Sequence, residues 1–134
     1  MANITPHAIR LLPGQDLKSE IQKYVETNQI KAGWICTCVG SLSTYNIRFA
    51  DVSIGSTAKM NCEIVSLSGT VSLNGSHLHI CISDSNGKTL GGHLLDGCII
   101  YTTAEIILLS TDAFQFERVN DGTTPWKELQ IKPI

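Results

Sequence analysis

The alternation of short strand-like runs with glycine-containing turns restricts the fold of this chain more than any other feature of its sequence. Seven such runs follow residue 33, at 34–39, 45–52, 62–73, 78–83, 89–95, 98–110 and 113–119. The turns between them include Asn74-Gly75, Asn86-Gly87 and Asp96-Gly97, pairs that favour tight hairpins because Asn, Asp and Gly tolerate a left-handed backbone. Short turns connect antiparallel neighbours, so the pattern predicts a mainly antiparallel sheet.

One helix is expected close to the N-terminus. Residues 7–12 have the pattern of a first strand, and Asp16 can cap a helix that starts directly after it. Apolar side chains then recur at helical spacing, at Leu17, Ile21 and Val25. We therefore predict an α+β fold, with a mainly antiparallel β-sheet of six to seven strands and one packed N-terminal helix, in a single domain over residues 1–134.

Charge and hydropathy argue against two classes of protein. The formal net charge is −2 and no two of the ten Lys and Arg residues are adjacent, so we expect no strong non-specific attraction to nucleic acid. No apolar run approaches the roughly 20 residues of a membrane helix, and a signal-peptide pattern is absent. We expect a soluble protein of the cytoplasm that has no membrane partner.

The five cysteines do not follow the spacing of a disulfide framework, which indicates free thiols in a reducing compartment. Cys36 and Cys38 are two apart on an expected strand, so their sulfurs could share one face and hold a soft metal. No second cysteine pair lies at a zinc-ribbon spacing, and we therefore regard buried thiols as the better interpretation.

Three of the four histidines fall on one expected hairpin. His77 and His79 are two apart on a strand and share a face, and the turn around Asn86-Gly87 leads into a second strand that carries His93. If the loop is residues 85–87, His93 lies opposite His79 and all three imidazoles face the same way. If the loop is only Asn86-Gly87, His93 points to the other face unless Gly91-Gly92 forms a bulge.

A three-histidine cluster with an open position is typical of zinc, although imidazole also binds copper, nickel and iron. The sequence therefore indicates a divalent transition metal, with zinc as the first candidate, bound by His77, His79 and His93. The alternative is that these are ordinary half-buried histidines on a sheet face, hydrogen-bonded to neighbours or to water.

The run 98–109 is apolar or neutral except at Glu105, which indicates a strand that is buried on both faces. One helix can cover only one sheet face, so we expect oligomerisation to cover the other. A carboxylate in such a run is either paired or bound to a cation, or it lies exposed at an edge or an interface rim. Glu105 is accordingly a candidate to support the metal ligands.

The motifs of common enzymes and of DNA-reading proteins are missing. The sequence has no nucleophile elbow, no phosphate-binding loop and no helix-turn-helix or zinc finger. A metal-bound water would permit hydrolysis or hydration, but Glu105, Asp84 and Asp96 are only weak candidates for an acid or a base. The sequence favours a binding protein over an enzyme and leaves the enzyme as an alternative.

Seven ordered segments resemble the PPC domain, a family conserved in plants and prokaryotes, in its stand-alone prokaryotic form. They are the helix after Pro13-Gly14, GSL at 40–42, EIVSLSGTV at 63–71, GSHLH at 75–79, DSNG at 84–87, GGHL at 91–94 and TAE at 103–105. The resemblance covers almost the whole chain. It implies a homotrimer of α+β subunits, often described as DNA-binding, and a metal at His77, His79 and His93.

Two departures from the plant members of this family weaken the expectation of DNA binding. The AT-hook, an Arg-Gly-Arg-Pro element that contacts the minor groove, is absent, and Met60-Asn61-Cys62 stands where the plant proteins have Gly-Arg-Phe. Three functions stay open: a trimeric module that binds a metal or a small ligand, a DNA-associated regulator, and a metal-dependent enzyme.

Overall fold

The computed structural model describes all residues, 1–134, and contains one helix and eight strands. The helix is α1 (Leu17–Thr27), and the strands are β1 (Ile4–Leu11), β2 (Gly33–Arg48), β3 (Ser56–Ser72), β4 (Gly75–Ser83), β5 (Thr89–Leu94), β6 (Ile99–Thr111), β7 (Phe114–Val119) and β8 (Glu128–Pro133). Six strands form the main sheet and two form a separate ribbon. The predicted α+β class, the antiparallel sheet and the single N-terminal helix are confirmed.

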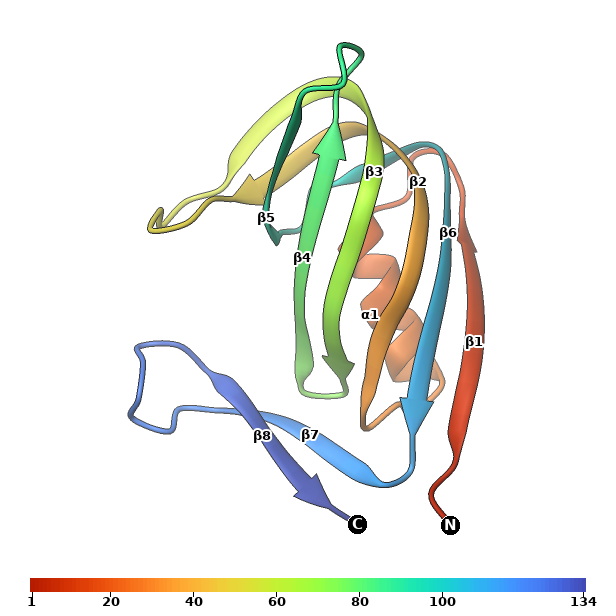
Figure 1. Cartoon of the computed structure of the whole chain (residues 1–134), viewed down its shortest axis with the longest axis vertical. Helices are drawn as coiled ribbons and strands as arrows, with labels where there is room; N and C mark the ends of the chain where they lie inside the picture. The colour runs from red at the N-terminus through yellow and green to blue at the C-terminus, as the bar shows by residue number, and fades with distance from the viewer.

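The main sheet is antiparallel throughout, in the order β1-β6-β2-β3-β4-β5, and it curls back on itself (Figure 1). The end of β2 pairs with β5 through Ile47–Leu94 and Arg48–His93, so β2, β3, β4 and β5 form a closed ring of neighbours. Gly92 permits this closure, because a Cβ there would lie 2.5 Å from the carbonyl oxygen of Arg48. The closure brings the end of β2 next to the predicted histidine strands.

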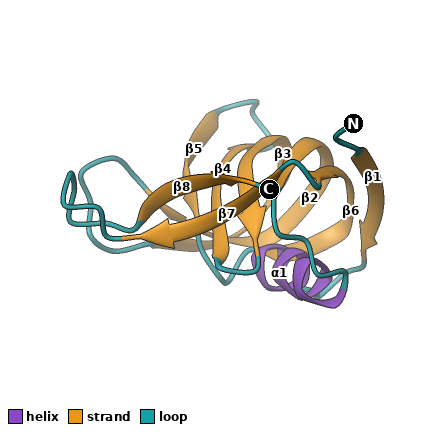
Figure 2. Cartoon of the chain, turned by 90° about the horizontal axis from the view of Figure 1, so that it is seen from below, coloured by secondary structure: helices purple, strands orange, loops and turns teal.

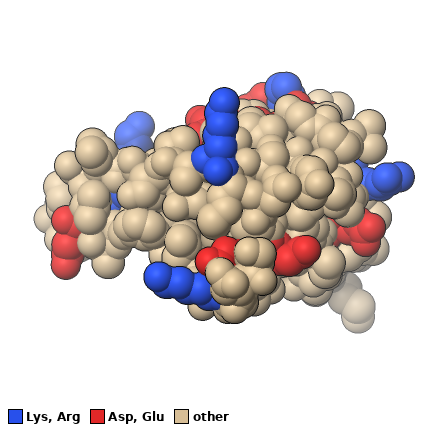
Figure 3. All heavy atoms as spheres, turned by 90° about the horizontal axis from the view of Figure 1, so that it is seen from above, with Lys and Arg blue, Asp and Glu red and all other residues tan.

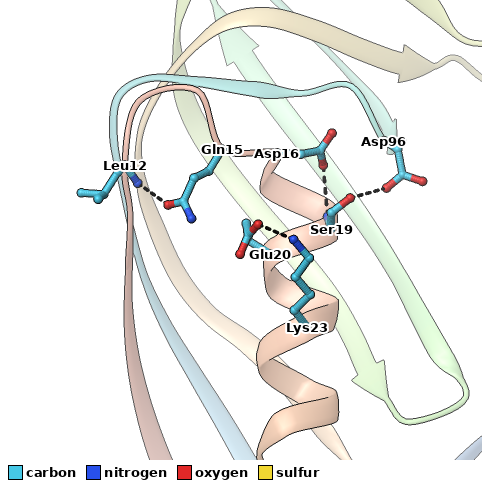
Figure 4. Close-up of polar contacts among 7 residues, drawn as sticks. All are labelled: Leu12, Gln15, Asp16, Ser19, Glu20, Lys23 and Asp96. Atoms are coloured by element: carbon cyan, nitrogen blue, oxygen red, sulfur yellow. Dashed lines mark hydrogen bonds and ion pairs between the residues drawn. The ribbon is translucent and has the colours of Figure 1, made fainter.

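Helix α1 begins where the sequence predicts and is tied to the β5–β6 turn. The Asp16 carboxylate accepts a hydrogen bond from the Ser19 amide at 3.1 Å, and the Ser19 hydroxyl donates to Asp96 at 3.3 Å (Figure 4). Leu17, Ile21 and Val25 are fully buried against the sheet. The cap therefore fixes where the helix starts, and its apolar stripe fixes which side lies on the sheet. At eleven residues, this one helix is too short to cross a membrane.

Only one face of the sheet is covered by the helix (Figure 2). Strand β6 has Ile100, Ala104 and Ile106 in the core, but Tyr101 and Ile107 on its other face are 47% and 37% exposed. One face of this strand is therefore buried within the chain, and burial of the other face by a partner chain stays a prediction. Each chain leaves an apolar outer face on β1, β6 and β2.

The β7–β8 ribbon leaves the main sheet after β6 and runs beneath the ends of β3 and β4 (Figure 1). Phe116 holds it in place: its side chain is 9% exposed and its amide donates to the carbonyl of Lys31 at 3.0 Å. The sequence pattern predicted β7 but not β8, whose residues are mostly polar and exposed.

The predicted strand 34–39 and the first half of the predicted strand 45–52 are parts of the single strand β2, which ends at Arg48, so residues 49–52 are not a strand. The chain passes Gly40-Ser41 with irregular pairing instead of a turn. A bulge also lies between Ile35 and Thr37, so Cys36 is exposed while Cys38 is buried. The expectation that their sulfurs could share one face is therefore wrong. All five cysteines are free thiols; Cys38, Cys62 and Cys98 are buried as predicted, whereas Cys36 is exposed and Cys81 is half-buried.

Candidate metal centre

The β4–β5 hairpin has the three-residue loop, residues 85–87, that the sequence left as one of its alternatives. The Asp84 amide donates to the carbonyl of Lys88 at 2.9 Å, and Gly87 closes the turn at φ +78°. Pairing then continues without a bulge through Gly91 and Gly92. This register decides which way the second histidine strand faces.

His77 and His79 on β4 and His93 on β5 lie together on one face of the hairpin. His79 pairs directly with His93, and their ring centroids are 4.5 Å apart. The His77 ring lies 5.1 Å from that of His79 and 5.0 Å from that of His93, stacked on the latter at 12°. One potential ligand nitrogen from each residue lies within 4.8 Å of the other two. We call these three residues the histidine cluster.

Each histidine also has a polar neighbour on the adjacent strand. The cross-strand pairs are His77 with Thr70, His79 with Ser68, and His93 with Arg48. Side chains of directly paired residues share a sheet face and lie close together. The histidine cluster is therefore bordered by two hydroxyl groups and one guanidinium, and by no carboxylate among these partners.

The surroundings favour neutral imidazoles. Burial lowers the pKa of His77, the positive charges of Arg118 and of the neighbouring imidazole of His79 act in the same direction, and Glu128 opposes them. Burial also lowers the pKa of His93, with a further contribution from Arg48. His77 is open to solvent on one side, but the ribbon removes water from the other. Neutral imidazole is the form that binds a metal.

A cleft of about 730 Å³ opens beside the histidine cluster, between the end of β2, the β3–β4 turn and the ribbon. His77 and His93 form part of its wall, and Arg48 and Arg118 form another part. Only three of its 14 lining residues are hydrophobic. A metal on the histidine cluster would therefore face a polar space that is large enough for a small molecule.

The two arginines are held in defined positions. The guanidinium carbon of Arg48 lies 5.2 Å from the centre of the Trp126 ring, and its Nη1 donates to the Val52 carbonyl at 3.3 Å. Arg118 donates from Nη2 to Thr70 Oγ1 at 2.8 Å, beside His77. Burial lowers the pKa of Arg118, while Glu128 acts in the opposite direction.

The family model of the Plants and Prokaryotes Conserved (PCC) domain matches residues 1–112. The chain belongs to this family. The match ends after β6, so the PCC model covers the main sheet and the histidine cluster, while the β7–β8 ribbon lies beyond the matched residues.

The chain is also similar to a curated protein and to a solved structure over almost its whole length. The chain is 41% identical over 128 residues to the bifunctional protein GlmU of Synechococcus, and it spans about a fifth of that protein's length (96% of this chain, 20% of the relative). A hypothetical protein from Salmonella has the same fold, with a TM-score of 0.96, 36% identity and coverage of 99% of this chain and 96% of the other.

Two further solved structures are similar over nearly the whole chain. The metal-containing protein AF0104 from Archaeoglobus fulgidus has a TM-score of 0.82 at 25% identity, with coverage of 94% of this chain and 93% of that one. A "putative DNA binding protein" from Bacteroides thetaiotaomicron has the same TM-score at 19% identity, with coverage of 97% of each chain, a likeness that shows the fold alone.

The remaining candidates from the sequence lie away from the histidine cluster of this PCC domain. Glu105 is exposed on the outer face of β6, paired with Arg10 on β1 and Val39 on β2, and it lines neither cleft at the histidines. Asp84 accepts hydrogen bonds from two amides of its own turn, and Asp96 accepts one from Ser19 near the start of α1. The structure therefore brings together the three histidines but not these carboxylates.

Sequence reasoning missed the groups that surround the histidines. Arg48 reaches the site through the closure of β2 onto β5, and Arg118, Trp126 and Glu128 come from the ribbon. No local pattern connects these positions to the hairpin.

Proposed function

We propose that this PCC-domain protein binds a divalent transition metal, with zinc as the first candidate, through His77, His79 and His93. The observation that carries the proposal is the approach of one nitrogen from each histidine to within 4.8 Å of the others. Three imidazoles that share a sheet face are a donor set that suits zinc, copper, nickel or iron. The name of the Archaeoglobus structure, a metal-containing protein, supports the same function for this fold.

The donor set fits zinc after a small adjustment. Zinc–nitrogen bonds of about 2.0–2.1 Å in a tetrahedral site place the ligand nitrogens roughly 3.4 Å from one another. The present separations, up to 4.8 Å, would have to shorten by about 1.4 Å, and the exposure of His77 and His79 leaves space for their rings to move. The lowered pKa values of His77 and His93 keep these ligands neutral in mildly acidic solution.

Three protein ligands leave an open position on a tetrahedral metal, and that position would face the cleft. We infer that the metal serves to bind a small ligand there. A metal-dependent enzyme is the alternative, and Glu128, which lines the cleft, is the carboxylate that could act as its base. Glu128 accepts a hydrogen bond from the Thr124 hydroxyl, which would orient it.

We also propose that the protein is a homotrimer. Its support is the apolar outer face, where Val39, Tyr101 and Ile107 are exposed on neighbouring strands, together with the trimer that the family resemblance implies. Glu105 and Arg10 are cross-strand partners on the same face. They would lie at or near the subunit interface.

Zinc binding at equilibrium tests the metal proposal. Dialysis of the chelator-treated protein against zinc should load one ion per chain, and His79→Ala should reduce the affinity by at least tenfold, because His79 lies beside both other ligands. The matched control is His7→Gln, since His7 bonds to Tyr24 and Ser110 far from the cluster. Equal zinc occupancy in all three proteins would mean that the histidines are only a polar patch.

A DNA-associated role is the second candidate, because the Bacteroides protein with the same fold is named a DNA-binding protein. Lys and Arg side chains are few and separated on the face that Figure 3 presents, with Asp and Glu between them. We therefore expect weak binding to duplex DNA that falls steeply with salt. A titration at two salt concentrations checks this, and a nanomolar sequence-specific complex at physiological salt would contradict it.

A further inference from the structure

Arg48 and Arg118 are half-buried at the cleft, and neither forms an ion pair with a carboxylate; Glu128 acts on Arg118 without contacting it closely enough to pair. The two ion pairs of the molecule lie elsewhere, on α1 and on the β7–β8 ribbon. A guanidinium that has lost part of its water normally gains a negative partner, because an unpaired charge is costly to bury. Two such groups in one cleft indicate that their partner is a ligand.

Both guanidinium groups keep donors free for that ligand. Arg48 donates one hydrogen bond to the Val52 carbonyl, and Arg118 donates one to the Thr70 hydroxyl. Each guanidinium has five N–H donors, so most of them stay available. The Trp126 ring supports one side of Arg48 and restricts its rotation. The cleft therefore presents oriented donors. Because the arginine side chains are already held in place, they lose less conformational entropy when a ligand binds.

The charges that line the cleft are positive on balance. Arg48, Arg118 and Lys127 face it, against Asp51 and Glu128. The Glu128 carboxylate is bonded to a hydroxyl group and not paired with either arginine. A divalent metal on the histidine cluster would add two further positive charges, so the cleft attracts anions.

We propose that this cleft binds a small organic anion, whose carboxylate or phosphate group lies between Arg48 and Arg118 and completes the coordination of the metal on the histidine cluster. The part that involves the metal rests on the proposed function, whereas the arginine contacts do not. Arg48 is the direct cross-strand partner of His93, and Arg118 is bonded to the partner of His77. One oxyanion can therefore reach the guanidinium groups and the metal together.

The rest of the ligand is small and mostly polar. A volume of about 730 Å³ is within the usual range for small-molecule sites, and few of the lining residues are hydrophobic. The Trp126 side chain, 57% exposed, offers the main flat apolar surface. Trp126, Arg118 and Lys127, which belong to the ribbon and its connecting loop, lie beyond the residues that the family model matches.

Titration calorimetry with two probes tests the proposal. Oxalate represents a carboxylate ligand and inorganic phosphate a phosphate ligand, and each is titrated into the zinc-loaded full chain. We expect saturable binding of at least one probe. Arg48→Met and Arg118→Met should each weaken it by roughly tenfold to a hundredfold, because each loses a charge-assisted hydrogen bond. The probe that binds more tightly identifies the anionic group.

The controls separate this proposal from the metal site. Lys59→Met removes a positive charge at an exposed position of β3 that does not line the cleft, and it should bind the probe like the wild type. Arg48→Lys keeps the positive charge but loses the forked donor geometry, so its affinity for the probe should be intermediate. This variant also provides a test if Arg48→Met folds poorly. All variants should still take up zinc.

Zinc binding without any probe binding, or equal probe affinity in wild type and arginine variants, overturns the anion site and leaves the metal site standing. Arginine-dependent probe binding in a protein that takes up no zinc supports the arginine contacts and rejects the metal proposal alone.

Discussion

At the scale of single residues, the charges next to the histidine cluster and its burial determine how readily its imidazoles take up a proton. The cluster has cationic neighbours, Arg48 and Arg118, and the one carboxylate that acts on it, Glu128, is at the edge. Positive neighbours and burial both disfavour a protonated imidazole. The site is therefore arranged to keep its nitrogens available below the pH at which a free imidazole would take up a proton.

This arrangement makes stability depend on pH in a direction that can be checked. The pKa values of His77 and His93 are lowered in the folded protein, so below about pH 6.5 the unfolded chain binds more protons than the folded one. The free energy of unfolding of the metal-free protein should therefore fall as pH drops from about 6.5 toward the lowered values. It should not change on account of these groups at higher pH.

Urea unfolding between about pH 5.5 and 7.5 measures this dependence. A double variant, His77→Gln with His93→Gln, should show a flatter profile, because it lacks both groups. The same slope in both proteins would assign the dependence to other residues. Zinc affinity should begin to decline only below about pH 6.5, since protons then compete for the ligands.

At the scale of elements, the β3–β4–β5 meander holds the cluster, and its register depends on close backbone approaches. Gly69 on β3 pairs with Leu78, between the two histidines of β4, and has φ +132°. A Cβ added there would overlap the carbonyl oxygen of His77. Glycine at this position allows β4 to lie against β3 where His77 must be held.

Gly69→Ala should lower the free energy of unfolding by roughly 2–4 kcal/mol, since it combines an unfavourable backbone conformation with a steric overlap. It should also weaken zinc binding, because relief of the overlap moves the β4 backbone at His77. Chemical unfolding and a zinc titration of the same variant measure the two effects. Gly14→Ala is a useful control: Gly14 has a left-handed φ of +86° but open space around it, on the turn before α1, so the change should cost less and leave zinc affinity nearly unchanged. Wild-type values for Gly69→Ala would show that the strand can accommodate a side chain there.

At the scale of the whole molecule, the sheet has one covered and one uncovered face. The helix covers the core side, and the outer face of β1, β6 and β2 carries exposed apolar side chains such as Val39, at 63%, and Tyr101, at 47%. No second helix covers the outer face. An apolar area on adjacent strands is a normal basis for symmetric association.

Val39→Lys should therefore shift the protein from trimer toward monomer, because it places a charge in the middle of the outer face. Light scattering after size-exclusion chromatography at micromolar concentration measures the mass. Ile134→Lys, a change at another exposed apolar residue, away from the outer face, should leave the mass unaltered. A monomeric wild type would reject the trimer, and a trimeric Val39→Lys would place the interface on another surface.

The sequence by itself determined the local parts of this protein. The Asp16 cap and the stripe at Leu17, Ile21 and Val25 specify α1. The turn residues Asp84 and Gly87 predict a hairpin, with His93 opposite His79 in one of the two loop lengths that the sequence leaves open, and the structure has that loop. These features depend on neighbours within a few residues, where spacing and backbone preferences are decisive. The histidine cluster was foreseeable for the same reason.

The tertiary structure alone decided what surrounds the cluster. Arg48 reaches His93 because the sheet curls until β2 pairs with β5, and Arg118 and Trp126 arrive on a ribbon whose second strand, β8, has too weak a pattern to predict. The bulge at Cys36, which separates the faces of two cysteines, also depends on pairing with β6. Such contacts join residues tens of positions apart, and they form only when burial of the whole core selects one curvature and one register for the sheet.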